Sequence, residues 1–178
     1  MTKNRSHIGL LLCLSLFLIN CKNKEIVSTG DFDQLSRVIE IGSWKYALHV
    51  ENQNKEKGSA NMGLSSHYLK ATLYISNTKS NKSLLYSIAK DAEDYEQKYK
   101  YLSFESKEDL SIRYKGEYIY PIGYVFEPSN GLSNSEKLVY KFQINDEIFQ
   151  QLKQDSKSVE YWYIDKLVGV GKICFKQQ

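Results

Sequence analysis

The alternation of apolar and polar residues near position 140 is the feature that most constrains how this chain can fold. Every second residue there is apolar, and most residues between them are polar: Leu138, Tyr140, Phe142 and Ile144 oppose Lys137, Lys141 and Gln143. Successive side chains of a strand point to opposite faces of a sheet, so a period of two predicts a half-buried strand. The segment therefore predicts a sheet with one face against a core.

The same period recurs from Trp44 to the end of the chain. It predicts strands at 44–50, 69–75, 99–105, 110–114, 117–126, 138–144, 159–164 and 168–175, with 84–89 as a hairpin partner after a turn at 77–83. Pro121 cannot donate a ladder hydrogen bond, so segment 117–126 is predicted to be an edge strand or to break near its middle. Gly169 and Gly171 are predicted to mark a bulge, because the apolar parity changes across them.

Only the segment 145–153 has convincing helical spacing. Asn145 can cap a helix there, in which Ile148, Phe149 and Leu152 share a face. Segment 90–98 is predicted as a helical turn or a loop. Eight or nine short strands with one short helix predict a mainly β fold, an antiparallel β-sandwich over 44–178. The order of elements loosely resembles immunoglobulin-like lipoprotein domains of unknown function.

The first 21 residues have the layout of a bacterial targeting signal. A polar, basic segment (1–7) precedes an apolar run from Ile8 to Ile19. Twelve residues are too few to span a bilayer, which takes about 20, but they suit the apolar region of a signal peptide. Residues 1–20 are therefore predicted to be a signal peptide, and 21–43 a polar tether that includes a short helical turn at 32–39.

The end of the apolar run, Leu18-Ile19-Asn20-Cys21, resembles the lipobox of bacterial lipoproteins, of the kind found in Bacteroidota. The resemblance implies that Cys21 receives diacylglycerol on its thiol and that a peptidase cuts just before it. Lys22 follows, where Asp retains enteric lipoproteins in the inner membrane, so the outer membrane is implied. The stretch 22–25 lacks the acidic run of many surface-exported lipoproteins, which favours the periplasmic face and leaves surface exposure open.

Charge and cysteine content agree with this localisation. The formal net charge of +3 comes from 24 Lys and Arg against 21 Asp and Glu. Without Lys3 and Arg5 the balance is 22 against 21, so the charge gives no reason to expect nucleic-acid binding. Cleavage would discard Cys13 and lipidation would use Cys21. Only Cys174 would remain, which we interpret as a buried small hydrophobic residue.

No local motif indicates catalysis, a metal or a cofactor. His49 and His67 lack neighbouring ligands at metal-binding spacing, and no nucleophile motif or phosphate loop is present. The acidic run 91–96 is interpreted as a solvated loop. An envelope hydrolase built from distant carboxylates such as Glu127 and Asp165 is the least favoured hypothesis, and we predict that the protein is not an enzyme.

An excess of tyrosine is the one unusual feature of the composition. Of 14 tyrosines, seven lie between positions 95 and 124. Tyr118, Tyr120 and Tyr124 share strand parity, so they either pack the core or form an exposed aromatic patch. Two functions follow: a membrane-tethered, non-catalytic module that binds an envelope protein, or a carbohydrate- or peptide-binding lipoprotein that uses this patch.

Overall fold

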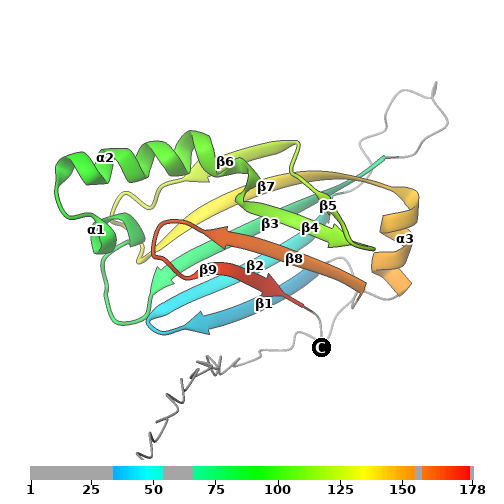
Figure 1. The fold of residues 1–178 in the computed structure, drawn as a ribbon, viewed down its shortest axis with the longest axis horizontal. Coiled ribbons are helices and arrows are strands. Elements are labelled where there is room, and N and C mark those ends of the chain that lie inside the picture. Colours follow the sequence, from blue (N-terminus) through cyan, green and yellow to red (C-terminus); the bar gives the residue numbers. More distant parts are fainter. Residues whose placement is uncertain (1–33, 54–65, 155–157, 177–178) are drawn as a thin grey trace, which may run out of the picture.

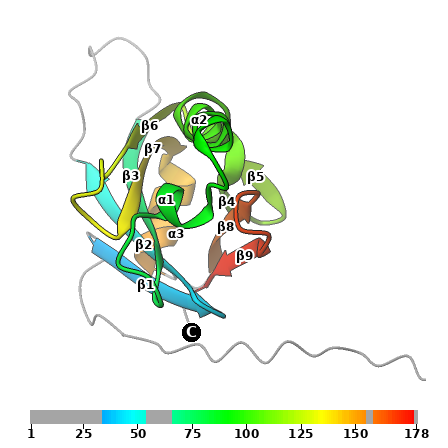
Figure 2. The same cartoon turned by 90° about the vertical axis from the view of Figure 1, so that its left-hand side faces the viewer.

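The computed structural model describes residues 34–53, 66–154 and 158–176. These residues form two antiparallel sheets that face each other (Figures 1 and 2). The five-stranded sheet has the order β1-β2-β3-β7-β6, formed by Gln34–Ile41, Trp44–Gln53, Ser66–Asn77, Ser135–Asn145 and Gly123–Glu127. The four-stranded sheet has the order β5-β4-β8-β9, formed by Glu117–Ile119, Leu110–Tyr114, Val159–Asp165 and Gly171–Phe175. The predicted mainly β, sandwich-like fold is confirmed at this level.

The core lies between the two sheets and follows the predicted alternation. On β7, Leu138, Tyr140 and Phe142 are fully buried, whereas Lys141 and Gln143 lie on the outer face. The register pairs these residues directly across the sheet, for example Tyr140 with Ala71 of β3. Inward residues of both sheets thus form one continuous apolar layer, because each strand presents every second side chain to it.

Helices close the sandwich at both of its ends (Figure 1) and along one edge (Figure 2). Helix α1 (Leu84–Ile88) buries Leu84 and Leu85 at one end. Helix α3 (Asp146–Gln154) buries Phe149 and Leu152 at the other end, and the backbone N–H of Ile148 donates to the Asn145 side chain at 2.9 Å, which confirms the predicted cap.

Helix α2 (Ala92–Lys100) lies along the edge where β6 and β5 approach each other. It continues into the π-helical turn η1 (Tyr101–Glu105) and the 3-10 turn η2 (Ser106–Asp109). The acidic run predicted as a solvated loop begins this helix: Asp91 caps it by accepting from the N–H of Asp94 at 2.8 Å. Acidic residues in its first turn and lysines in its last complement the helix dipole.

Several other predictions of local structure are wrong. Segment 34–41 is the edge strand β1 and not tether or helix, so the sheet begins ten residues before the predicted boundary at 44. Its inward side includes Arg37 opposite Leu48, and this polar residue conceals the period of two. Segments 84–89 and 99–105 are helical and not strands, because apolar residues such as Tyr95, Tyr99 and Leu102 follow helical spacing.

The prediction for Pro121 is confirmed. Pro121 separates β5 from β6, and the two short strands lie at the edges of different sheets. The predicted bulge at Gly169 and Gly171 is instead a turn between β8 and β9, where both glycines have positive φ angles of 78° and 81°. Residues with a Cβ rarely adopt such angles, so the glycines permit the turn.

Candidate functional site

The structure does not bring the three predicted patch tyrosines together on one surface. Tyr118 lies on β5 and is 41% exposed, and Tyr120 lies in the following connection and is 51% exposed. Tyr124 lies beyond Pro121, on β6 of the other sheet, opposite the buried Tyr140. The shared parity does not give a shared face, because the chain changes sheets between Tyr120 and Tyr124.

Tyr124 is held inside the fold by two hydrogen bonds. Its hydroxyl donates to the carbonyl of Leu102 at 2.5 Å and accepts from Ser106 Oγ at 2.6 Å. Its ring packs on Tyr140 with a centroid separation of 4.9 Å. Burial raises the pKa of Tyr124 to about 12. This tyrosine therefore attaches η1 to the five-stranded sheet.

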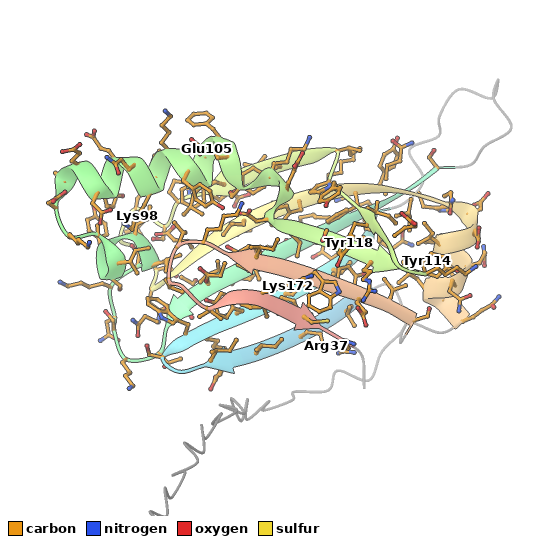
Figure 3. All side chains as sticks on the ribbon, in the orientation of Figure 1. Arg37, Lys98, Glu105, Tyr114, Tyr118 and Lys172 are labelled. Carbon is orange, nitrogen blue, oxygen red and sulfur yellow. The ribbon has the colours of Figure 1, made fainter. Side chains whose placement is uncertain are left out.

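Tyr118, in contrast, belongs to a cluster on the outer face of the four-stranded sheet. Figure 3 shows Tyr118 and Lys172 on the face turned toward the viewer. Lys172 Nζ lies 4.3 Å from the ring centre of Trp162 and 5.5 Å from that of Tyr118, and it donates to the Tyr118 hydroxyl at 3.2 Å. Arg113 lies on β4 directly opposite Tyr118, and its guanidinium is 5.9 Å from the centre of the Tyr118 ring. These are cation–π contacts, which the negative ring faces favour.

Glu160 organises the cationic groups around this cluster. Its carboxylate accepts from Lys176 at 2.6 Å, from Trp162 Nε1 at 2.8 Å and from Arg113 at 3.3 Å. The hydrogen bond from Lys176 is the main reason why the pKa of Glu160 is lowered. Lys172 contacts no carboxylate in the part of the chain that the structure describes. We call Arg113, Tyr118, Glu160, Trp162, Lys172 and Lys176 the cation–aromatic face; it carries three cations and one carboxylate.

Of the residues of this face, the sequence predicts only Tyr118 as a binding residue. Glu160 and Trp162 alternate with Tyr161 and Tyr163 in the predicted strand 159–164. Because Tyr161 and Tyr163 are buried, this alternation indicates that Glu160 and Trp162 point outward. The face on which Lys172 lies cannot be predicted from the alternation, because the turn at Gly169 and Gly171 interrupts the period of two. Only strand pairing brings β5, β4, β8 and β9 into one surface.

A second aromatic surface lies on α1, α2 and β6, and the sequence did not predict it. The rings of Tyr86, Tyr95, Tyr99 and Phe126 follow one another with centroid separations of 5.0, 6.3 and 5.6 Å. Tyr95 and Tyr99 are four residues apart and so share one face of α2, a helical spacing that was the usable signal. A hollow of about 470 Å³ lies beside Tyr86 and Tyr95. We call these four rings the aromatic row.

The two carboxylates of the hydrolase hypothesis are not brought together. Asp165 is buried between the sheets, where it accepts from the Tyr46 hydroxyl and, at 2.8 Å each, from the N–H groups of Leu167 and Val168. Glu127 lies on the outer face of β6 and pairs with Lys137 at 2.7 Å. These hydrogen bonds of Asp165 hold the β8–β9 turn against the core. The geometry of Asp165 therefore indicates a structural role.

A second buried carboxylate, Asp109, forms a similar network. It accepts from the Tyr101 hydroxyl and, at 2.7 Å, from Lys166 Nζ. Burial raises the pKa of Asp109, and the hydrogen bonds from Lys166 and Tyr101 oppose this effect. The network ties η1 and η2 to the β8–β9 turn and explains the position of Tyr101.

An Asp165→Ala variant is expected to lose about 3–5 kcal/mol of unfolding free energy, because it leaves the Tyr46 hydroxyl and two N–H groups buried without an acceptor. Asp165→Asn keeps an acceptor and should lose less. Glu127→Ala, at an exposed ion pair, should lose about 1 kcal/mol or less. Urea unfolding curves measure all three, and equal losses for Asp165→Ala and Glu127→Ala would contradict the structural role.

The histidines and Cys174 pack against their neighbours. His67 is buried, stacks on Phe149 at 3.7 Å and contacts the Asp146 carboxylate, whereas His49 meets the Tyr74 ring nearly edge-on. Cys174 is half-buried on β9, and burial is the main cause that raises the pKa of its thiol to about 11. Among the described residues, no group of three or more His, Cys, Asp or Glu side chains is placed to hold a metal ion.

Comparisons with known proteins do not extend this description. No family model matches the chain, and none of the curated proteins or solved structures is significantly similar to it. Within the described residues, no helix has both the length and the apolar character to cross a membrane. Leu18, Ile19, Asn20 and Cys21 lie outside the described residues, so the lipobox remains a prediction from the sequence.

Proposed function

We propose that this protein is a lipid-anchored lipoprotein of the cell envelope and that its β domain is a non-catalytic module that binds another envelope protein. The lipobox resemblance at Leu18–Cys21 supports the anchor and suggests the outer membrane, facing the periplasm. The cation–aromatic face supports the binding role. No cofactor and no nucleic acid is part of the proposal.

The observation that carries the binding role is the surface cluster of exposed Lys172 and Tyr118 around the half-buried Trp162. Trp, Tyr and Arg dominate the energetics of protein interfaces, and the rings of Trp and Tyr offer large contact areas at a small cost in conformational entropy. The ion pairs of Glu160 and the cation–π contacts hold these side chains in place before binding. Preorganised groups lose less entropy when a partner arrives.

The charge of the face specifies the chemistry of the partner. Arg113, Lys172 and Lys176 outnumber the single carboxylate of Glu160, and Lys172 contacts no carboxylate among the described residues. An acidic protein surface would supply the missing anions, because complementary charges steer association and fix the orientation of the complex. We therefore infer an envelope protein with an exposed acidic segment as the partner.

Mutation of the face tests this function. Proteins crosslinked in intact envelopes and purified with the full-length chain should include one partner whose recovery falls with Trp162→Ala and with Lys172→Glu. A central tryptophan contributes about 2 kcal/mol or more to an interface, so its loss should weaken the complex about thirtyfold. The measurement is the affinity of the purified pair.

The matched control reverses a charge on the other sheet. Lys70→Glu changes a lysine on the outer face of β3, which belongs to the five-stranded sheet and not to the sheet of β8 and β9. It should leave partner recovery and affinity unchanged. If Lys70→Glu and Lys172→Glu reduce the affinity equally, the interaction is a general charge effect and the proposed face is not the binding site.

The aromatic row favours the second candidate function, a lipoprotein that binds carbohydrate or peptide. Two of its rings, Tyr86 and Tyr95, line a hollow of about 470 Å³, a size typical of small-ligand sites. In this candidate function the ligand-binding tyrosines are Tyr86 and Tyr95, in place of Tyr118, Tyr120 and Tyr124. Saturation-transfer NMR with envelope oligosaccharides, recorded for the wild type and for Tyr95→Ala, distinguishes this candidate function from protein binding.

The finer classification of the fold is also part of this proposal. The loose resemblance to immunoglobulin-like lipoprotein domains is supported by the two facing antiparallel sheets. Such domains commonly serve as interaction modules built on a rigid sandwich, which agrees with the proposed role of the outer sheet face.

A further inference from the structure

A hollow of about 410 Å³ lies on the outer face of the five-stranded sheet, near the ends of β2 and β3. Its floor is formed where Ala47 lies directly opposite Tyr74, because a small side chain there leaves space between larger ones. The lining consists almost entirely of polar side chains: Lys45, His49, Tyr74, Ser76, Asn77, Thr78, Asn134 and Ser135 surround Ala47. This volume lies within the range of small-molecule sites.

The lining offers hydrogen-bonding groups that the described part of the protein does not use. The side chains of Lys45, Ser76 and Asn134 and the Tyr74 hydroxyl make no hydrogen bond to any described residue. Hydroxyl and amide groups both donate and accept, which matches the hydroxyl groups of a sugar. The hollow is therefore equipped for a hydroxyl-rich ligand and not for an apolar one.

Two further features restrict the ligand. Tyr74 and His49 meet at 82° with ring centres 5.7 Å apart, so they form an aromatic corner against which a sugar ring can pack. Lys45 supplies the only full charge of the lining. The nearest carboxylate in the strand register, Glu40, lies opposite Lys45 on β1 but forms no ion pair with it. A single anionic group on the ligand would complete the contacts of Lys45.

We propose that this hollow binds a small sugar acid, a saccharide ring with several hydroxyl groups and one carboxylate. The carboxylate lies at Lys45, the hydroxyl groups at Ser76 and Asn134, and the ring against Tyr74. The site is independent of the cation–aromatic face, since the two lie on the outer faces of opposite sheets. The protein thus combines a protein-binding sheet with a saccharide-binding sheet.

Titration of the full-length protein with glucuronate, glucose and acetate tests the proposal by calorimetry. Glucuronate should bind, glucose should bind about tenfold more weakly because it lacks the carboxylate, and acetate should not bind measurably because it lacks the ring. Lys45→Met should reduce the affinity for glucuronate about tenfold, to that of glucose, and should leave the affinity for glucose unchanged. Asn134→Ala should weaken both sugars.

Two matched variants and a fold check complete the experiment. Lys70→Met removes a lysine on the same outer face that is not part of the lining, and it should leave both affinities unchanged. Glu40→Gln removes the competing carboxylate and should leave glucuronate binding equal or tighter. Thermal unfolding of each variant verifies that it is folded. Binding of neither sugar by the wild type, or equal losses for Lys45→Met and Lys70→Met, would overturn the proposal.

Discussion

A Cys21→Ser variant is expected to lose all incorporation of a palmitate analogue and to leave the membrane fraction of the cell envelope. In bacterial lipoproteins, which the segment Leu18–Cys21 resembles, the cysteine thiol carries the diacylglycerol. Each buried CH₂ of an acyl chain contributes about 0.8 kcal/mol, and two or three chains anchor a protein stably. Loss of the single attachment point should therefore remove the protein from the membrane completely.

The other cysteine of the predicted mature chain provides the control. Cys174→Ser should label and fractionate like the wild type, because its half-buried side chain lies on β9 of the folded domain. Lys22→Asp should retain the protein in the inner membrane of a host with enteric sorting. Equal labelling of Cys21→Ser and the wild type would show that the lipobox interpretation is wrong.

The second large effect is expected in alkaline solution, where the free energy of unfolding of the domain should decrease steeply above about pH 10. Burial raises the pKa of four tyrosines that are at most 2% exposed: Tyr46, Tyr140, Tyr161 and Tyr163. In the unfolded chain a tyrosine ionises at about pH 10. Above this pH the unfolded chain releases protons that the folded domain keeps, so the free energy of unfolding decreases as the pH rises.

The size of this effect follows from proton linkage. At pH 11 each buried tyrosine should lower the free energy of unfolding by about 1.4 kcal/mol, and the four together by about 6 kcal/mol. Single domains are stable by about 5–15 kcal/mol, so this loss is enough to approach unfolding. Tyrosinate absorbance and circular dichroism, recorded together against pH, should change in one cooperative step.

Two phenylalanine variants show whether burial is the cause. The hydroxyl of Tyr140 has no hydrogen-bond partner among the described residues, so Tyr140→Phe removes an ionisable group without breaking a bond. It should move the midpoint of alkaline unfolding to higher pH. Tyr120→Phe, at an exposed position, should leave the midpoint unchanged. Equal midpoints for the two variants would contradict the linkage argument.

Local patterns predicted most strands, because a half-buried strand records its environment in every second residue. Trp44–Val50, Leu69–Ile75 and Leu138–Ile144 all lie within observed strands. The pattern failed at the edges of the fold. Strand β1 places Arg37 inward, and α1 and η1 are five residues long each, too short to show a helical period.

The candidate sites were less predictable than the fold. Tyr118 was predicted for the patch and does lie on the cation–aromatic face, but Trp162 and Lys172 come from distant strands. The hollow beside Lys45 likewise needs β2, β3 and the residues just before β7. Local sequence patterns do not specify which strands pair, because pairing depends on which strand faces are buried together in the core.

The sequence by itself determined the period of the strands, the break at Pro121 and the predicted lipid anchor, since each depends on a short segment whose chemistry is local. Only the tertiary structure decided where the tyrosines point. Tyr118 and Tyr124 have the same parity and are six residues apart, yet one lies on an outer face and the other is bonded to Leu102 and Ser106. The chain passes from one sheet to the other between them, and that crossing exchanges the inner and outer faces.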